Sequence, residues 1–399
     1  MCTFKITNYK SDTNDKMALG GPDVSNSVMI DGLYITHNLL QVTGEQTVQP
    51  VESKGLHYLL LGEVYNYDTT LPSDIYYVIK CYEKYGDNFL EHLDGEFLII
   101  IIDSGVIKFF TDPWGTRQAW MHEESDNFYF GTYPITQHRD FKIENNSQYN
   151  FDIKNQKLVC VNSEIHKWNL NQFKDTLDDV TIALEEAIDK RYHPKSFLLF
   201  SGGLDSAVIA LRLSDTKKHI KSGTLNYTNA EDMETHSQVM EYCKNYHDNK
   251  IFYSPENKPS HVTEEIQLYY KQYCKVMLMG NGSDEIFCNY MNKPKVAKQI
   301  IGCNFIDFPD DLTEVFPWVN FYSGRHGWLI PWWEHKALSD GLEVRSIFLD
   351  KKLVQEWLNL SVHLKNKEHK YFLKEYLRNR NIKIPNSVAG IPSQMYWKL

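Results

Sequence analysis

The sequence has no long hydrophobic run. The longest stretch that is wholly apolar extends from Phe97 to Ile102, far short of the roughly 20 residues that a membrane-spanning helix needs. The first residues also lack the charged, apolar and small-residue order of a secretory signal peptide. We therefore expect no association with a membrane and a cytoplasmic location.

Cysteine and positive charge are also scarce. The seven cysteines are an odd number and no two are spaced as CxxC, which favours reduced thiols over a disulfide framework. Lysine and arginine together number 42 against 52 acidic residues, which gives a net charge of −10. A chain this acidic is not expected to bind a nucleic-acid backbone. The motif GxxxxGK followed by Ser or Thr is absent too, which excludes a Walker-type NTPase.

The length and the local patterns predict two domains. A chain of 399 residues exceeds what one ordinary core holds. In residues 1–140, short apolar or aromatic runs bounded by Gly, Pro, Asn or Asp are typical of antiparallel strands, with one helix predicted from Asp74 to Tyr85. Residues 141–176 are polar and are predicted to connect the domains. In residues 177–399, helical patterns alternate with short strands, which predicts an α/β domain.

A glycine turn joins a strand-like run to a helix-like run in SFLLFSGGLDSAVIALRL, which begins at Ser196. The run from Phe197 to Phe200 is continuously apolar, as in a strand buried on both faces of a parallel sheet. Apolar residues then recur at helical spacing, and Asp205 stands where that helix begins. Such a turn presents unpaired N–H groups and the helix dipole. We therefore expect the loop Ser201–Ser206 to bind a phosphate.

A second loop of the same kind follows the strand-like run in VMLMGNGSDEIF, which begins at Val276. If both strands belong to one parallel sheet, both loops lie at its carboxyl edge, where ligands of open α/β sheets bind. Asp205 of the first loop and Asp284 of the second would then face each other. Because Mg²⁺ prefers one or two carboxylates together with phosphate oxygens, these two are the predicted metal ligands.

Several segments carry a resemblance to a known family. SGGLDS at Ser201 resembles the pyrophosphate loop of N-type ATP pyrophosphatases, which cleave ATP between its α and β phosphates. Cys2, followed in order by GGPD, THNLLQV, GEVYNY, SDIYYVI, LDGEF and DPWGTRQ, is similar to class II glutamine amidotransferases. GLEVRSIFLDKK and KYFLKEYL match later parts of the pattern. To about Leu377, the chain therefore resembles the glutamine-hydrolysing asparagine synthetases.

The resemblance implies both a fold and a reaction. The fold would be an α+β sandwich of the N-terminal-nucleophile glutaminase type at residues 1–140, then an α/β parallel-sheet ATP pyrophosphatase domain at residues 177–399. With ATP and Mg²⁺, such an enzyme converts aspartate to a β-aspartyl-adenylate. Ammonia, free or released from glutamine, opens the adenylate to give asparagine, AMP and pyrophosphate. These small molecules are the expected partners, and a homodimer is compatible with the sequence.

For the glutaminase site, the resemblance implies three roles. Cys2 would be the nucleophile, and removal of Met1 would give it an adjacent amine as a base. Gly62 would donate its N–H to the oxyanion. Glu63 and Asp74 would hold the amine of glutamine.

For the synthetase site, the resemblance implies that Asn281 stands at a catalytic position and that Asp205 and Asp284 bind Mg²⁺. Lys370 would supply a positive charge to the phosphates. The residues implied for ATP are Leu199, Ser201, Gly202, Gly203, Asp205, Ser206, Leu225, Met279, Gly280 and Lys370.

Four departures from the family pattern bear on the two reactions. Leu39 replaces an arginine that clamps the carboxylate of glutamine, Leu61 replaces an asparagine of the oxyanion hole, and Thr3 replaces a glycine. Asn281 replaces a glutamate, and an amide cannot accept a proton at neutral pH. These departures leave open glutamine hydrolysis at Cys2 and aspartate as the acceptor.

Two alternatives to this reaction follow. One is a ligase that adenylates another carboxylate and closes an amide with an amine already on its substrate, as β-lactam synthetases and lasso-peptide cyclases do. Its first domain would be a degenerate glutaminase. The other, a non-catalytic binding protein, is disfavoured because the phosphate loop and both candidate magnesium ligands are present.

Overall fold

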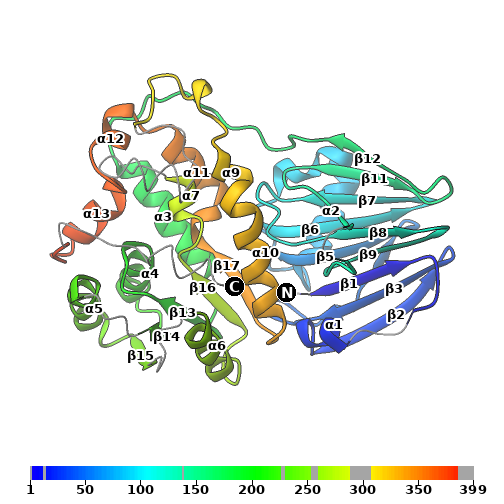
Figure 1. Ribbon diagram of the computed structural model, residues 1–399, viewed down its shortest axis with the longest axis horizontal. Helices are drawn as coiled ribbons and strands as arrows, with labels where there is room; N and C mark the ends of the chain where they lie inside the picture. The colour runs from blue at the N-terminus through cyan, green and yellow to red at the C-terminus, as the bar shows by residue number, and fades with distance from the viewer. Residues whose placement is uncertain are drawn as a thin grey trace. The chain divides into compact units, whose positions relative to one another are not determined.

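The computed structural model describes residues 2–11, 15–136, 139–225, 230–252, 259–287 and 307–384 (Figure 1). The chain divides into two compact units. The first comprises Met1–Lys167 with Leu329–Glu343, and the second comprises Trp168–Trp328 with Val344–Leu399. Each unit thus combines segments that are distant in the sequence.

The first unit contains two six-stranded antiparallel sheets, with strand orders β10-β8-β9-β1-β3-β2 and β12-β11-β7-β6-β5-β4. The strands of the first sheet are β1 (Thr3–Thr7), β2 (Val24–Ile30), β3 (Leu33–Leu39), β8 (Trp120–Glu124), β9 (Asn127–Gly131) and β10 (Phe141–Lys142). Those of the second are β4 (Val51–Ser53), β5 (Leu56–Val64), β6 (Gly95–Asp103), β7 (Val106–Thr111), β11 (Gln148–Asp152) and β12 (Lys157–Asn162). The helical elements are α1 (Asp15–Gly20), α2 (Asp74–Tyr85) and the 3-10 helix η1 (Gly86–His92). The antiparallel strands predicted for this part of the chain are present.

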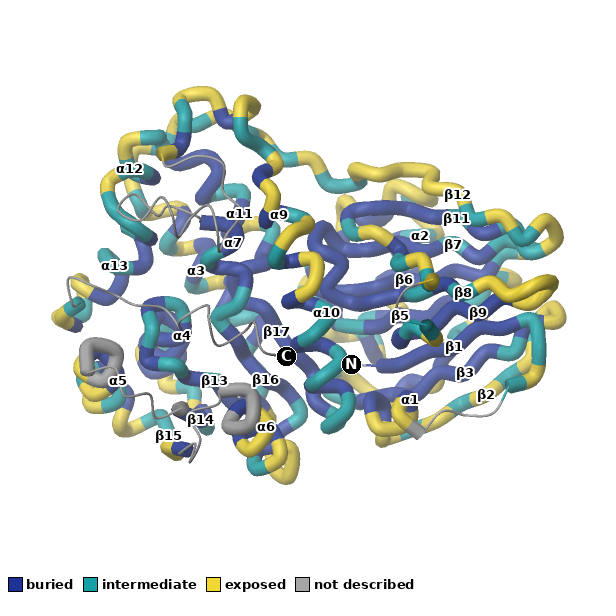
Figure 2. The backbone as a smooth tube through the Cα atoms, viewed as in Figure 1, coloured by how far each residue is buried: buried dark blue, intermediate teal, exposed yellow. Residues whose placement is uncertain are grey.

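The apolar run on β6 fills both sides of the second sheet. Leu98 and Ile100 join the core between the two sheets, whereas Ile99 and Ile101 join a second core with α2. Successive side chains of a strand point to opposite faces, so a continuous apolar run is what burial on both faces requires (Figure 2). Burying each of these side chains contributes about 1.5–3 kcal/mol.

The outer face of the first sheet is also covered. The hydroxyl of Thr3 on β1 donates to the carbonyl of Met17 on α1 at 2.7 Å. A Cβ on Gly20 would lie 3.1 Å from Leu338, on the last turn of α10 (Gly324–Leu338). His335 of α10 lies 3.1 Å from the carbonyl of Thr132 through its Nε2. The segment from residue 329 to 343 is therefore a structural part of the first unit.

The second unit is built on a five-stranded sheet with the order β15-β14-β13-β16-β17. β14 pairs in parallel with β13 and β15, and β13 pairs in parallel with β16, so a parallel sheet is present as predicted. The strands are β13 (Ser196–Phe200), β14 (Ile220–Leu225), β15 (His247–Phe252), β16 (Val276–Met279) and β17 (Glu343–Ser346). The helices are α3 (Asp178–Arg191), α4 (Leu204–Asp215), α5 (Ala230–Cys243), α6 (Pro259–Tyr270), α7 (Ser283–Ile286), α9 (Val319–Tyr322), α11 (Lys351–Leu358), α12 (Val362–Asn366) and α13 (Tyr371–Arg378), with 3-10 turns η3 (Leu312–Glu314) and η4 (Ile347–Leu349).

Helices cover both faces of this sheet. On β14, a Cβ on Gly223 would lie 2.5 Å from the side chain of Ile266 on α6. The next residue, Thr224, points to the other face, where its hydroxyl lies 3.1 Å from Nε2 of His236 on α5. Because helices cover both faces, a ligand can reach the sheet only at the ends of its strands.

The structure differs from the predicted connecting segment at residues 141–176, which includes β10, β11 and β12. β11 pairs with β7 along its whole length, so the second sheet continues into this segment. β12 carries little sequence signal because four of its six residues are apolar although most of its side chains are exposed, so it lacks the alternation of apolar and polar residues that marks a half-buried strand.

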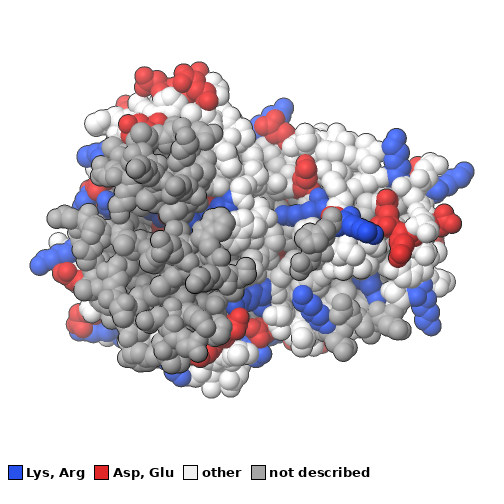
Figure 3. Space-filling model, in the orientation of Figure 1, with Lys and Arg blue, Asp and Glu red and all other residues white. Residues whose placement is uncertain are grey.

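One face of the molecule shows charges of both signs among its described residues (Figure 3). On the face shown in Figure 3, Lys and Arg side chains are interspersed with Asp and Glu. Within the described ranges, no helix has both the length and the hydropathy to cross a bilayer.

Candidate functional site

Two loops meet at the carboxyl edge of the parallel sheet in the second unit. One follows β13 and leads into α4, and the other follows β16 and leads into α7. Because β13 and β16 are neighbouring parallel strands, their carboxyl ends lie side by side. The two loops that the sequence singled out are therefore adjacent.

The loop after β13 is held by its own hydroxyl groups. Gly202 has a φ of +82°, a conformation that glycine adopts without strain. The hydroxyl groups of Ser201 and Ser206 lie 3.2 Å apart, and Ser206 donates to the carbonyl of Gly203 at 3.2 Å. Gly203 caps α4 without any side chain that could accept from the first turn. The first N–H groups of α4 thus remain suited to an anion.

The loop after β16 brings its own residues onto the first loop. Ser283 donates to Oδ1 of Asp205 at 2.7 Å. Gly282 has a φ of +90° and turns the chain into α7. Asp284 follows in the first turn of α7. Asp205 and Asp284 are therefore brought together at one edge, as the sequence predicted for their position.

Lys370 lies between these two carboxylates. It is the residue before α13, and its Nζ lies 2.8 Å from both carboxylate oxygens of Asp205 and 2.5 Å from Oδ1 of Asp284. Burial alone would lower the pKa of Lys370, but the two carboxylates hold it above its ordinary value. Burial alone would raise the pKa of Asp284, but Lys370 holds it below its ordinary value. Burial raises the pKa of Asp205 even though Lys370 opposes the shift. Lys370 is thus a charged ammonium at neutral pH.

Next to this triad is an acid–base cluster that the sequence reasoning missed. Glu285 is buried, and its carboxylate lies 3.3 Å from Nε of Arg325 and 3.7 Å from Nε2 of His326. Burial and the Asp284 carboxylate raise the pKa of Glu285 to about 7, against the influence of Arg325. Burial lowers the pKa of His326 to about 4, so that ring is neutral. The only sequence signal was the adjacency of Glu285 to Asp284, since Arg325 and His326 approach through the fold.

The other predicted residues of this site lie around the same edge. Leu199 is half-buried on β13 and Met279 is buried at the end of β16. Asn281 lies in the second loop, and its Oδ1 is buried without a hydrogen-bond partner. Leu225 ends β14, but its side chain lies outside the described residues.

The donor set at this edge suits magnesium. Asp205 and Asp284 are two carboxylates at one place, and Mg²⁺ is usually held by one or two carboxylates while phosphates and water supply its other ligands. Among the residues that the structure describes, no group of three or more His, Cys, Asp or Glu side chains could hold a metal. Two carboxylates leave the other positions around a cation to phosphate and water, as Mg²⁺ bound with a phosphate requires.

The first unit places Cys2 in an apolar environment. The side chain is 5% exposed and belongs to the core between the two sheets, together with Leu39 and Leu61. Burial raises the pKa of the Cys2 thiol to about 11. Burial also lowers the pKa of His37, on β3, to about 3, and its Nε2 has no hydrogen-bond partner. The thiol is thus mostly protonated at neutral pH.

Gly62, Glu63 and Asp74 lie near one another at the end of β5 and the start of α2. A Cβ on Gly62 would lie 1.9 Å from the carbonyl oxygen of Glu96, so only glycine fits there. Asp74 accepts from the N–H of Val64 at 3.0 Å. Burial and the charge of Glu63 raise the pKa of Asp74 to about 8. Two carboxylates that repel each other in this way favour a bound ammonium group.

Buried charges elsewhere in the first unit were also missed. Arg117 is 2% exposed and its Nη2 lies 3.6 Å from Oε2 of Glu96. Burial alone would lower the pKa of Arg117, but Glu334 and Glu96 raise it. Burial raises the pKa of Glu334, on α10, to about 8 despite Arg117. This cluster joins the segment from residue 329 to 343 to the β-sheets of its unit.

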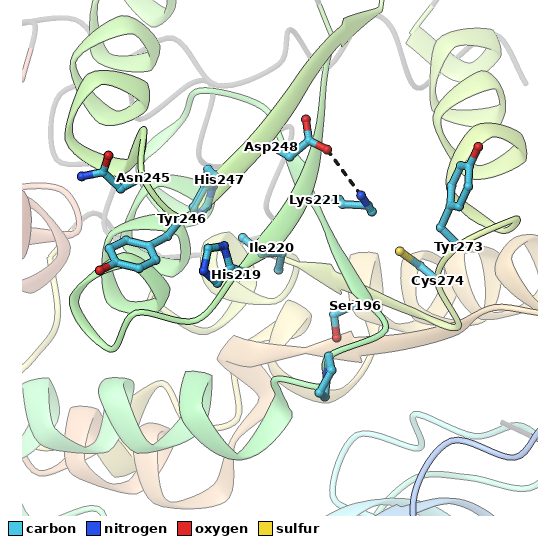
Figure 4. Close-up of a pocket in the computed structure, with 11 residues that line it drawn as sticks. Ser196, His219, Ile220, Lys221, Asn245, Tyr246, His247, Asp248, Tyr273 and Cys274 are labelled. Atoms are coloured by element: carbon cyan, nitrogen blue, oxygen red, sulfur yellow. Dashed lines mark hydrogen bonds and ion pairs between the residues drawn. The ribbon is translucent and has the colours of Figure 1, made fainter.

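A separate cavity of about 370 Å³ opens at the opposite edge of the parallel sheet (Figure 4). Its lining includes Ser196, Ile220 and His247, which are the first residues of β13, β14 and β15. Lys221 and Asp248 form an ion pair at 3.4 Å beside it. Because ligands of open parallel sheets bind at the carboxyl edge, we do not assign the candidate site to this cavity.

Comparison with solved structures finds many similar chains, among them the following two. One is the glutamine phosphoribosylpyrophosphate amidotransferase of B. subtilis complexed with ADP and GMP, with 9% identity, a TM-score of 0.33, and coverage of 70% of this chain and 75% of that chain. The other is described as the allosteric regulatory enzyme of purine biosynthesis, with 11% identity, a TM-score of 0.32, and coverage of 72% and 77%. Scores this low carry no argument about function.

Comparison with curated proteins finds glutamine-hydrolysing asparagine synthetases. A putative one from Methanocaldococcus jannaschii is 22% identical over 85% of this chain and 71% of its own length. One from Triphysaria versicolor is 25% identical over 84% of this chain and 64% of its own length. A probable one from Dictyostelium discoideum is 22% identical over 95% of this chain and 78% of its own length. The chain therefore spans about two thirds to three quarters of the length of these relatives. No family model matches the chain. These relatives confirm the predicted resemblance to the glutamine-hydrolysing asparagine synthetases.

Proposed function

We propose that the protein is an ATP-dependent ligase of the asparagine-synthetase type, which amidates aspartate and releases AMP and pyrophosphate. The observation that carries this proposal is the position of Lys370 between Asp205 and Asp284, beside the Ser201–Ser206 loop. A lysine, two acids and a helix N-terminus at the carboxyl edge of a parallel sheet form a site for a polyphosphate and its cation. The relatives named above support the same class of reaction.

Each part of this edge has a role in the proposal. The N–H groups at the start of α4 and the hydroxyls of Ser201 and Ser206 bind the leaving pyrophosphate. Lys370 offsets the charge that develops on the phosphates. Asp205 and Asp284 would hold Mg²⁺, which would supply positive charge to neutralise the phosphates. Aspartate is then activated as a β-aspartyl-adenylate, which ammonia opens.

The first unit is proposed to supply ammonia from glutamine. Cys2 attacks the side-chain amide, the N–H of Gly62 stabilises the oxyanion, and Glu63 and Asp74 bind the amine of glutamine. The raised pKa of Asp74 supports an ammonium subsite. In this role the thiol of Cys2 needs a base, and the free amine left by removal of Met1 is suited to that task.

A second candidate function is supported by Leu39 and Leu61. Both side chains are buried in the same core as Cys2, so neither the carboxylate of glutamine nor the oxyanion gains a polar partner from these positions. In this candidate, the enzyme adenylates another carboxylate and closes an amide with an amine on the substrate. The first unit would then be a degenerate glutaminase that serves as a scaffold.

ATP–pyrophosphate exchange tests the proposed activation step. Labelled pyrophosphate is added with Mg²⁺, ATP and one carboxylate at a time, aspartate first. We expect exchange with aspartate, its loss in Asp205→Ala, and its retention in Asp310→Ala, which changes an exposed aspartate of the same unit. Release of ADP in place of AMP would contradict the proposal. Exchange with another carboxylate but not with aspartate would favour the second candidate.

The nitrogen source is tested separately. Amide formation is measured with glutamine and with ammonium chloride in the wild type and in Cys2→Ala. We expect the variant to lose the glutamine-dependent product and to keep the ammonia-dependent one. Equal rates in both proteins with either source would make the first unit a scaffold.

A further inference from the structure

Lys370 reaches the two acids from the interior of the second unit. Its side chain is 3% exposed, whereas the side chains of Asp205 and Asp284 are 25% and 38% exposed. The ammonium therefore binds the buried side of the carboxylate pair. Part of each aspartate side chain is accessible to solvent.

The backbone holds the lysine in this place. Lys370 has a φ of +50° and directly precedes α13. The left-handed region is uncommon for a residue with a side chain. The first turn of α13 anchors the carbonyl of Lys370, since the N–H groups of Leu373 and Lys374 both donate to it, at 3.0 and 3.1 Å.

An ammonium in this position competes with a metal ion. It offsets one of the two negative charges and occupies both oxygens of Asp205 and one of Asp284. A divalent cation bound to both acids would lie a few ångströms from the ammonium, where two positive charges repel each other strongly. Metal alone should therefore bind weakly.

We propose that Lys370 is the resident cation of the ligand-free protein, and that a divalent cation takes the two carboxylates only when the phosphates of a nucleotide take the ammonium. In this proposal, the divalent cation and the nucleotide bind to the site together. This inference rests on the proposed function for the identity of the nucleotide. The competition between lysine and metal rests only on the geometry of the three side chains.

Mn²⁺ binding without nucleotide tests the inference, with free Mn²⁺ measured by electron paramagnetic resonance. We expect the wild type to bind no Mn²⁺ at this site at concentrations up to about 1 mM, the weak range of protein–ligand affinity. Lys370→Gln keeps an N–H donor near Asp205 but has no charge, so it should bind Mn²⁺ at least about tenfold more tightly. Lys374→Gln, in the first turn of α13 and paired with Glu368 at 2.7 Å, is the matched control and should behave as the wild type. The double variant Lys370→Gln with Asp284→Asn should lose the gained affinity.

Two results would overturn the inference. One is tight Mn²⁺ binding in the wild type that Asp284→Asn abolishes, and it can be observed even if Lys370→Gln does not fold. The other is a folded Lys370→Gln variant with no gain in Mn²⁺ affinity. The proposed function is tested independently by exchange, since neither measurement contains ATP or a carboxylate substrate.

Discussion

A side-chain carbon on Gly280 would lie 2.8 Å from Cβ of Asp205 and 3.4 Å from the backbone nitrogen of Ser206. The two loops at the carboxyl edge can thus approach only because position 280 has no side chain. This approach lets Ser283 donate to Asp205 and places Asp284 within reach of Lys370. The contacts of Lys370 with Asp205 and Asp284 depend on this close approach of the two loops.

Gly280→Ala should therefore damage the site. The added carbon overlaps Asp205 and pushes the loops apart, so we expect a loss of about 1–3 kcal/mol in the free energy of unfolding, as for overpacked sites, and loss of ATP–pyrophosphate exchange. The measurements are urea unfolding and the exchange assay. Gly327→Ala is the control, because a Cβ on this exposed helical glycine meets nothing within 4 Å. This control should be neutral or gain up to about 1 kcal/mol from helix propensity.

The elements predicted most accurately were those with local signals. The helix predicted from Asp74 to Tyr85 has these bounds in the structure, because Ile75, Val78 and Ile79 recur at helical spacing and are buried. The two loops of the parallel sheet were also predicted, since each combines an apolar strand, glycines and an acid. In each case, the residues that carry the signal lie within a few positions of one another in the sequence.

The contacts that were missed join distant segments. Arg325 reaches Glu285, and Glu334 acts on Arg117, only after the chain has folded. No periodicity or spacing encodes such pairs. Lys370 was expected to face phosphates, but no pattern in the sequence placed it between both acids.

Asp74→Asn should change how stability depends on pH. The pKa of Asp74 in the folded protein is about 8 and its ordinary value is 3.8, so between these values the folded state holds a proton that the unfolded chain has lost. The free energy of unfolding therefore falls as the pH rises through this range. Asparagine removes the titration and still accepts from the N–H of Val64, so the variant should gain stability over the wild type from pH 4 to pH 8. Urea unfolding at several pH values measures this, and a difference that does not change with pH would refute it.

The thiol of Cys2 should react slowly in the native protein. It is 5% exposed and its pKa is about 11, so only about one thiol in 10⁴ is ionised at pH 7. Cys160 is exposed on β12. We expect iodoacetamide to label Cys160 well before Cys2, as peptide mass spectrometry would show. Labelling of Cys2 as fast as Cys160 would contradict this prediction and would show that the thiol is accessible and ionised before glutamine binds.

Leu61→Asn should destabilise the first unit and should not restore a polar oxyanion hole. Leu61 is 1% exposed, pairs with Leu98 on β6 and belongs to the core between the two sheets. Asparagine there removes apolar contacts and buries an amide among apolar side chains, which together should cost about 2–5 kcal/mol in the free energy of unfolding. Leu19→Asn, at a residue that is 54% exposed, is the control and should change stability by no more than about 0.5 kcal/mol. Urea unfolding of both variants measures the difference. If Leu61→Asn were as stable as the control and hydrolysed glutamine faster than the wild type, Leu61 would be a residue of the site instead of a residue of the core.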